Sequence, residues 1–294
     1  MLQGIVLSAT ASVLFAVLYY YAVLLQPLDG MPIFGWRIVL GLPALTAWVL
    51  ALGSGAALLA LWRRVRREPM LALGLLVSAH LIGAQMALFM WAPLHGRALE
   101  VSLGYFLLPL VMVLAGRVVY GERLNRWQQL AVLLAALGVG HAIWQGGSLS
   151  WAAALVALGY PPYFMLRRRL QVEALPSLWA ETLLLVPAAL WLLASEPIST
   201  QLAQQPRLWG LLPLLGVLSA TALACYLAAS RRLPLGLFGL LGYLEPALLF
   251  GVSLLLGERM APGAAWTYVP IWLALGVLAV DGLQQWRRLG KRPV

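Results

Sequence analysis

Only a few ionisable residues stand deep inside the long apolar stretches of this sequence, and they are the first candidates for chemistry. His80 and Glu245 fall near the middle of two such stretches. Placing an ionisable group inside a bilayer is costly, so these groups are usually functional. His80 could bond a substrate carboxylate or titrate near physiological pH, and Glu245 could bind a substrate ammonium group or exchange a proton. The alternative for both is a structural hydrogen bond to a neighbouring helix.

Arg37 cannot shed its charge and therefore needs a carboxylate or water nearby. Glu100 stands at a comparable depth from the same end of its own apolar stretch. We predict an Arg37–Glu100 ion pair that acts as an outer gate or fixes helix orientation. By the same reasoning, Glu181 is expected to meet Arg117 near the opposite end.

Aromatic residues inside the apolar stretches form a second class of candidates. Their faces can stack on apolar or aromatic substrates, and their hydroxyl or N–H groups can bond polar parts of a substrate. We predict substrate contacts for Tyr20, Tyr105, Tyr163 and Trp91, together with His80 and Glu245. The alternative is that Trp and Tyr collect at membrane interfaces without binding a ligand.

Prolines inside the apolar stretches are candidates for hinges, because each removes a backbone hydrogen bond and bends its helix. Pro43 and Pro187 occupy matching places in the two halves of the chain, and so do Pro109 and Pro246. This pairing favours hinges at all four positions. The alternative is that membrane helices tolerate these prolines without moving.

The sequence lacks the motifs of several other functional classes. It contains no HExxH, GxSxG or Walker A motif, so we expect neither an intramembrane enzyme nor an ATP-driven pump. Its single cysteine, Cys225, excludes an intrachain disulfide and a CxxC redox site. We therefore expect no catalytic residue, no metal site and no cofactor.

Composition identifies the elements that must position these residues. Of 294 residues, 62% are apolar and 10% are charged, whereas soluble domains have roughly 45–50% and about 25%. A helix needs around 20 mostly apolar residues to cross a bilayer core. We predict an all-α membrane protein with ten transmembrane helices. The predicted spans are residues 4–25, 32–52, 70–91, 98–119, 127–145, 149–166, 176–195, 208–229, 234–256 and 264–286.

The net charge of +10 could indicate nucleic-acid binding, but its distribution indicates membrane topology. On ten spans, 16 of the 20 Lys and Arg residues fall on one side of the membrane. The positive-inside rule makes that side cytoplasmic and places both termini there, where the basic residues can contact anionic lipid head groups. We expect no nucleic-acid partner. The four basic residues on the other side are Arg37, Arg97, Arg207 and Arg259.

The chain also contains an internal repeat. The string GYFLLP at 104–109, followed by GE at 121–122, matches GYLEP at 242–246, followed by GE at 257–258. The repeat divides the predicted spans into two groups of five. An odd number of spans gives the two groups opposite orientations in the membrane.

The expected halves are residues 1–146 and 147–294, arranged as two inverted five-helix repeats around a central cavity. Many secondary transporters contain inverted repeats, because exchanging the conformations of the halves gives alternating access. A duplication retained in a channel, scaffold or enzyme is the alternative.

These repeated segments resemble the EamA domain of the drug/metabolite transporter superfamily, over the whole chain. Residues 91–106 resemble its RarD-like branch in particular. Leu108 stands where that branch usually has an asparagine, so no role of that asparagine is carried over.

The resemblance implies a secondary transporter of the bacterial inner membrane that works by alternating access. It implies export of amino acids (aromatic or apolar ones, methionine, threonine) or related small metabolites, with protons as a candidate coupling ion. Export of drugs, nucleosides or other metabolites, and a passive facilitator or channel, remain the alternatives.

Overall fold

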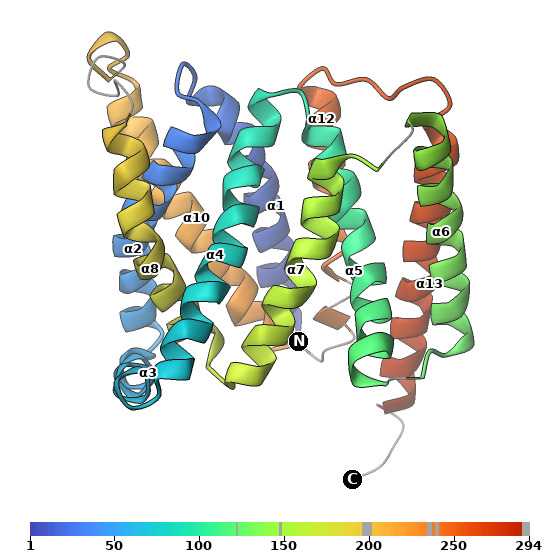
Figure 1. Ribbon diagram of the computed structural model, residues 1–294, viewed down its shortest axis with the longest axis horizontal. Coiled ribbons are helices and arrows are strands. Elements are labelled where there is room, and N and C mark those ends of the chain that lie inside the picture. The colour runs from blue at the N-terminus through green and yellow to red at the C-terminus, as the bar shows by residue number, and fades with distance from the viewer. Residues whose placement is uncertain (122, 147–148, 196–201, 234–236, 239–240, 290–294) are drawn as a thin grey trace.

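The protein is built from helices, most of which run across one slab (Figure 1). The computed structural model describes residues 1–121, 123–146, 149–195, 202–233, 237–238 and 241–289, and these ranges contain no strand. The helices are α1 (Leu2–Leu24), α2 (Gly30–Ala51), α3 (Gly55–Arg67), α4 (Pro69–Trp91), the short 3₁₀ helix η1 (Ala92–Leu94), α5 (Ala98–Tyr120), α6 (Arg126–Gly146), α7 (Trp151–Leu170), α8 (Ala174–Ala194), α10 (Leu208–Ser230), α12 (Leu244–Leu255) and α13 (Ala265–Leu289).

Within the described ranges, 8 helices are long and apolar enough to cross a membrane, and the chain is an integral membrane protein. They are α1, α2, α4 with η1, α5, α6, α8, α10 and α13. The helix α7 is not among them and ends in three arginines, Arg167 to Arg169. The helix α12 has only 12 residues. A count of ten spans therefore remains a prediction.

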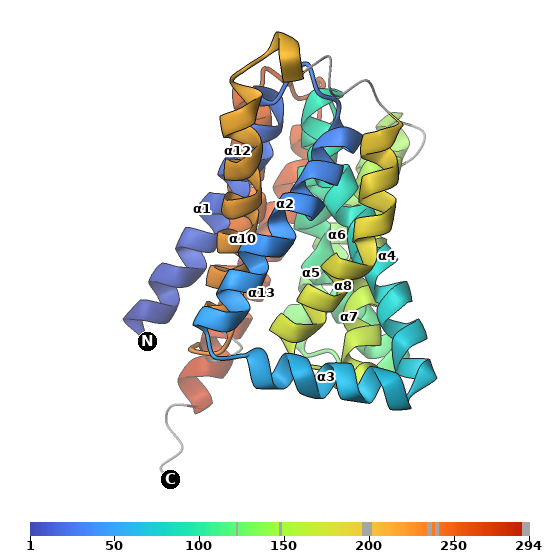
Figure 2. The ribbon, with the colours of Figure 1, turned by 90° about the vertical axis from the view of Figure 1, so that its left-hand side faces the viewer.

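One helix was not expected. Residues 55–67, which carry four arginines, lie between the predicted spans 32–52 and 70–91, and they form α3. This helix lies across the lower end of the bundle (Figure 2). Its buried Leu61 packs against α4, whereas Trp62 is half exposed. A segment that is apolar on one face only forms a surface helix instead of a membrane span.

The predicted span 234–256 differs most from the structure. Residues 234–236 and 239–240 lie outside the described ranges, and α12 begins only at Leu244. Pro246 therefore stands in the first turn of α12, where a missing N–H costs no helical hydrogen bond. The expected hinge at Pro246 remains a prediction.

The helices pack against several neighbours each, and α2 packs at the left side of the bundle in Figure 1. It contacts α4, α8 and α10, while α1 contacts α10 and α12, and α5 contacts α7 and α12. The pair α6 and α13 lies at one side of the molecule (Figure 1). Close approach of α5 and α7 depends on Gly104, because a Cβ there would lie 2.7 Å from the Ala153 carbonyl oxygen.

The start of α1, the end of α13 and α3 all lie at the lower end of the bundle (Figures 1 and 2). Most of the described arginines stand on α3 or at ends of other helices that reach this lower end. These are Arg63, Arg64, Arg66, Arg67, Arg117, Arg167, Arg168, Arg169, Arg231 and Arg232. The membrane side that this end faces remains a prediction.

Candidate functional site

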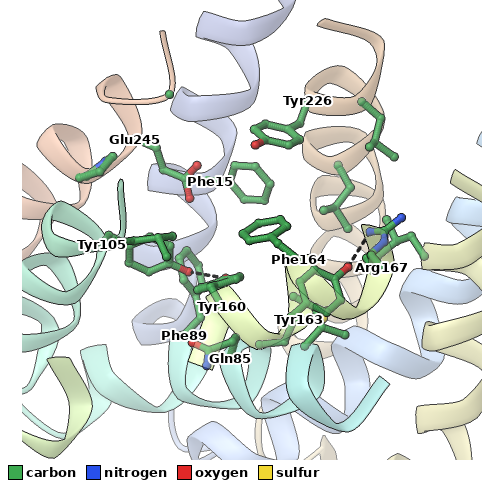
Figure 3. Close-up of a pocket in the computed structure, with 18 of the residues that line it drawn as sticks. Phe15, Gln85, Phe89, Tyr105, Tyr160, Tyr163, Phe164, Arg167, Tyr226 and Glu245 are labelled. Carbon is green, nitrogen blue, oxygen red and sulfur yellow. Dashed lines mark hydrogen bonds between the residues drawn. The ribbon is translucent and has the colours of Figure 1, made fainter. Parts of the chain in front are cut away.

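A cavity of about 240 Å³ lies between the helices α1, α2, α4, α5, α7, α8, α10 and α12 (Figure 3). The peripheral pair α6 and α13 contributes nothing to its lining. The lining residues are Phe15, Arg37, Ile82, Gln85, Met86, Phe89, Tyr105, Leu108, Pro109, Tyr160, Tyr163, Phe164, Arg167, Leu178, Leu223, Tyr226, Leu227, Gly242, Glu245 and Pro246. The lining is thus mainly apolar and aromatic, with a few polar groups, as is usual for small-molecule sites.

Aromatic rings dominate one stretch of this lining. The Tyr105 and Tyr160 hydroxyl groups lie 2.9 Å apart and share a hydrogen bond. Phe164, one turn after Tyr160 on α7, stacks on the Tyr160 ring with a centroid distance of 5.8 Å. Phe89 meets the edge of Tyr105 at 6.2 Å. Such a wall can hold a flat apolar group by stacking while its hydroxyl groups bond polar atoms.

Two of the predicted aromatic residues, Tyr105 and Tyr163, lie in this lining. The prediction omitted the other aromatic residues of the lining, Phe15, Phe89, Tyr160, Phe164 and Tyr226. Spacing offered a partial signal for one of them, since Tyr160 and Phe164 are separated by one helical turn. No comparable signal was available for Phe15 or Tyr226, which come from separate helices that only the tertiary structure brings together.

Arg37 also lines the cavity, and the predicted Arg37–Glu100 ion pair is not formed. The Arg37 Nε donates to Ser219 Oγ at 2.9 Å, and the guanidinium lies 5.6 Å from the centre of the Phe89 ring. Glu100 instead accepts from Arg97 at 2.8 Å and from the Ser150 hydroxyl. Arg97 and Glu100 are three residues apart, so a local pair forms in place of a long-range one.

Glu245 contributes a carboxyl group to the lining at the start of α12. Figure 3 shows it on the other side of the ring cluster from Gln85. Arg167 enters the lining from the last turn of α7, and it donates to the Tyr163 hydroxyl at 2.6 Å and to the Ala174 carbonyl at 2.9 Å. The cavity thus has charged groups of both signs beside an apolar wall.

The predicted contact between Glu181 and Arg117 is also absent. Glu181 is fully buried and accepts hydrogen bonds from Ser78 at 2.6 Å, Ser177 at 3.1 Å and Tyr163 at 3.1 Å. These four residues, which we call the Glu181 cluster, join α4, α7 and α8. The cluster explains how Tyr163 is held, because its hydroxyl lies between Glu181 and Arg167.

Three predicted binding residues lie outside the cavity lining. His80 is exposed, and its Nδ1 lies 2.8 Å from the Leu76 carbonyl oxygen of its own helix. Tyr20 is exposed on α1. Trp91 stacks on His95 with a centroid distance of 4.1 Å near the upper end of α4. The cavity face of α4 carries Gln85 and Phe89, and the helical repeat directs His80 elsewhere.

The paired prolines also divide between the cavity and the surface. Pro109 and Pro246 line the cavity. Pro43 and Pro187 lie inside α2 and α8 on exposed faces. Their role as hinges remains a prediction.

The upper end of the bundle contains the second copy of the repeated Gly-Glu motif. Glu258 accepts hydrogen bonds from the backbone N–H groups of Ala98 and Leu99, each at 2.7 Å. The preceding Gly257 has a φ of +86°, which permits the turn that directs Glu258 to the start of α5. A carboxylate there satisfies free N–H groups and complements the helix dipole. The matching residue of the first half, Glu122, lies outside the described residues.

The described part of the chain contains no group of three His, Cys, Asp or Glu residues that could hold a metal ion. The polar groups of the cavity are instead suited to hydrogen bonding and charge pairing with an organic molecule.

Comparison with known proteins gives relatives along the whole chain. No family model matches. The chain is 47% identical to the chloramphenicol-sensitive protein RarD of Pseudomonas aeruginosa over 296 residues, which cover 99% of this chain and 98% of that protein. It is 41% identical to an uncharacterized transporter of Haemophilus influenzae over 283 residues, covering 96% and 95%. It is 38% identical to protein RarD of Escherichia coli over 221 residues, covering 74% and 75%.

Proposed function

Because this chain belongs to the RarD family of membrane transporters, within the drug/metabolite transporter superfamily, we propose that it exports small amphipathic metabolites by alternating access. Amino acids with an aromatic or apolar side chain are the first candidates, with methionine, threonine and related metabolites after them. The observation that carries the proposal is the central cavity, whose aromatic wall is interrupted by charged groups of both signs. An amphipathic molecule needs both features in one site.

The size of the cavity suits this substrate class. Its volume of about 240 Å³ lies near the lower end of the roughly 300–1,000 Å³ typical of small-molecule sites. Tyr105, Tyr160 and Phe164 provide ring faces for the side chain. Arg37, Arg167 and Glu245 provide charged groups for the polar end.

Helix packing supports two inverted halves, 1–146 and 147–294. Equivalent helices would be α1 and α7, α2 and α8, α4 and α10, α5 and α12, and α6 and α13. If each helix is replaced by its equivalent, the α1–α10 contact becomes α7–α4, and the α2–α10 contact becomes α8–α4. The α5–α7 contact becomes α12–α1 in the same way. All six of these contacts are present. The contacts α2–α8, α5–α12 and α6–α13 map onto themselves. This pattern is expected of a pseudo-twofold axis in the membrane plane.

Basic residues at the lower end support a cytoplasmic location for that end, in the bacterial inner membrane. We further propose that Pro43, Pro109, Pro187 and Pro246 act as hinges during exchange. Glu245 is the proposed site of proton coupling, because it provides a carboxyl group among the described residues that line the cavity. A transported proton needs a group of this kind inside the pathway.

The experiment is countertransport in proteoliposomes containing the purified chain. Vesicles loaded with unlabelled phenylalanine, methionine, threonine or chloramphenicol are tested for accumulation of the corresponding labelled compound, with and without a pH gradient. Saturable countertransport of an amino acid is expected, because a carrier exchanges substrate through one site. Movement of chloramphenicol alone, or flux without countertransport, would contradict the proposal.

A matched pair of variants tests the cavity. Tyr160→Ala removes a ring from the aromatic wall, whereas Tyr20→Ala removes an exposed tyrosine outside the lining. Loss of one stacking and hydrogen-bonding ring is expected to weaken apparent affinity roughly tenfold or more. Equal effects of the two variants would show that the cavity is not the binding site.

A further inference from the structure

Two buried polar atoms in the cavity lining have no hydrogen-bond partner in the described part of the chain. They are Nη1 of Arg37 and Oε1 of Gln85. The Arg37 side chain is 5% exposed and Gln85 is 2% exposed. The third such atom, Nε1 of Trp36, belongs to a residue outside the lining. Buried polar groups are nearly always paired, so each exception needs an explanation.

The remaining contacts of both side chains hold them in place. Arg37 Nε donates to the buried Ser219 hydroxyl at 2.9 Å. Gln85 Nε2 donates to the Leu155 carbonyl oxygen on α7 at 2.9 Å. That bond also fixes the orientation of the amide, because a carbonyl oxygen can only accept and must face the NH₂ group. One donor and one acceptor are thus presented in fixed positions.

Both groups border the same part of the cavity. Gln85 and Phe89 are one helical turn apart on α4, and Figure 3 shows both at one edge of the cavity. The Arg37 guanidinium lies 5.6 Å from the centre of the Phe89 ring. Within the described ranges, Arg37 forms no ion pair with a carboxylate. The described lining therefore contains an arginine without an ion-pair partner and an amide carbonyl oxygen without a donor, beside aromatic rings.

We propose that Arg37 and Gln85 form a substrate subsite that binds a carboxylate carrying a hydrogen-bond donor on the adjacent carbon, as in α-amino and α-hydroxy acids. Arginine has donors only and keeps its charge, so its free Nη1 takes an anionic oxygen. The Gln85 carbonyl oxygen takes an N–H or O–H of the substituent. The rest of the molecule then extends along the aromatic wall.

This subsite rests on the proposed function and sharpens it, since it separates substituted from unsubstituted carboxylates. A site built to bond an N–H or O–H group rejects an analogue that lacks it, because the polar atom of the site then stays unpaired. A compound with a neutral amide in place of the carboxylate is also rejected, because the Arg37 guanidinium then has no anionic partner.

The test is isothermal titration of the purified full-length protein in detergent micelles with four compounds that share one phenylpropyl skeleton. L-phenylalanine and L-3-phenyllactate carry both groups, 3-phenylpropionate lacks the donor, and L-phenylalaninamide lacks the carboxylate. The first two are expected to bind at least about tenfold more tightly than the last two. This comparison needs no variant, so it remains decisive if a substitution prevents folding.

Two variants assign the preference to the two residues. Gln85→Met is expected to abolish the preference for phenyllactate over phenylpropionate. Arg37→Gln is expected to abolish the preference for phenylalanine over phenylalaninamide. Gln129→Met, on the exposed surface of α6, is the matched control and is expected to keep both preferences.

The outcomes separate this inference from the proposed function. Binding of all four compounds with equal affinity would overturn the subsite and leave an amphipathic cavity in place. Preferences that survive in Gln85→Met and Arg37→Gln would also overturn it. Binding of chloramphenicol with no binding of the four compounds would overturn the proposed function and the subsite together.

Discussion

The Glu181 cluster gives the sharpest prediction for stability. Glu181 is fully buried and accepts three hydrogen bonds, from Ser78, Ser177 and Tyr163. Glu181→Leu keeps much of the side-chain volume and leaves all three hydroxyl groups without this acceptor. Glu181→Gln keeps the shape and one accepting oxygen, and the two serine hydroxyl groups can turn to accept from the new NH₂ group.

The expected magnitudes follow from these contacts. Leaving a buried donor without its acceptor costs about 1–3 kcal/mol. Glu181→Leu does this to three hydroxyl groups, so we expect a cost of roughly 3–5 kcal/mol. Exchanging charged hydrogen bonds for neutral ones is expected to cost about 1–2 kcal/mol in Glu181→Gln. At roughly 2–4 °C per kcal/mol, the leucine variant should melt on the order of 10 °C below the unsubstituted protein, and the glutamine variant a few degrees below.

The assay is thermal unfolding in detergent micelles, followed by the amount of protein that stays monodisperse. Glu173→Gln is the matched control, because Glu173 precedes the same helix, its side chain is 63% exposed and it lies 3.8 Å from Arg231. A surface pair of this kind contributes about 0–1 kcal/mol. If Glu181→Leu melts together with Glu173→Gln, the reasoning about the buried network is refuted.

Three further predictions concern the packing of α6 against α13, the Glu258 cap at the upper end of the bundle, and the exposed His80. Gly138→Ala should destabilise the protein, because a Cβ there would lie 2.6 Å from a backbone oxygen of α13, whereas Gly140→Ala meets nothing within 4 Å and should not lower the melting temperature; equal melting would contradict this. Glu258→Gln should lower the melting temperature by an amount that corresponds to about 1–2 kcal/mol, since it removes the charge that caps the start of α5; an unchanged temperature would show that the cap contributes nothing. His80→Leu should leave countertransport and its pH dependence unchanged, because the side chain is exposed outside the cavity lining, and a shifted pH profile would restore it as a candidate.

The sequence predicted a large part of the architecture. Runs of apolar residues gave helices whose ends mostly agree within a few residues with the structure, as for 98–119 against Ala98–Tyr120. The amphipathic α3 and the late start of α12 were not predicted. Hydropathy detects segments that can be buried in lipid, and it carries little information about a surface helix or a helix interrupted inside the membrane.

The candidate site was predicted in part. Tyr105, Tyr163 and Glu245 line the cavity, whereas Tyr20 and Trp91 lie outside it. Arg37 was expected at a gate with Glu100, but it lines the cavity and donates to Ser219. An arginine in an apolar stretch needs a polar partner, but the sequence does not show which neighbouring helix provides that partner.

By itself, the sequence determined the class of protein and the residues that could serve a transport pathway, because apolar length, charge asymmetry and internal repetition are properties of the chain. Only the tertiary structure decided which faces of the helices meet. On α4, His80 and Gln85 are five residues apart in an almost uniformly apolar helix, and packing against α7 directs Gln85 into the cavity and His80 away from it. The apolar composition of a helix determines that it crosses the membrane. The rotation of the helix about its own axis is set by contacts with neighbouring helices, and a local sequence pattern does not predict these contacts.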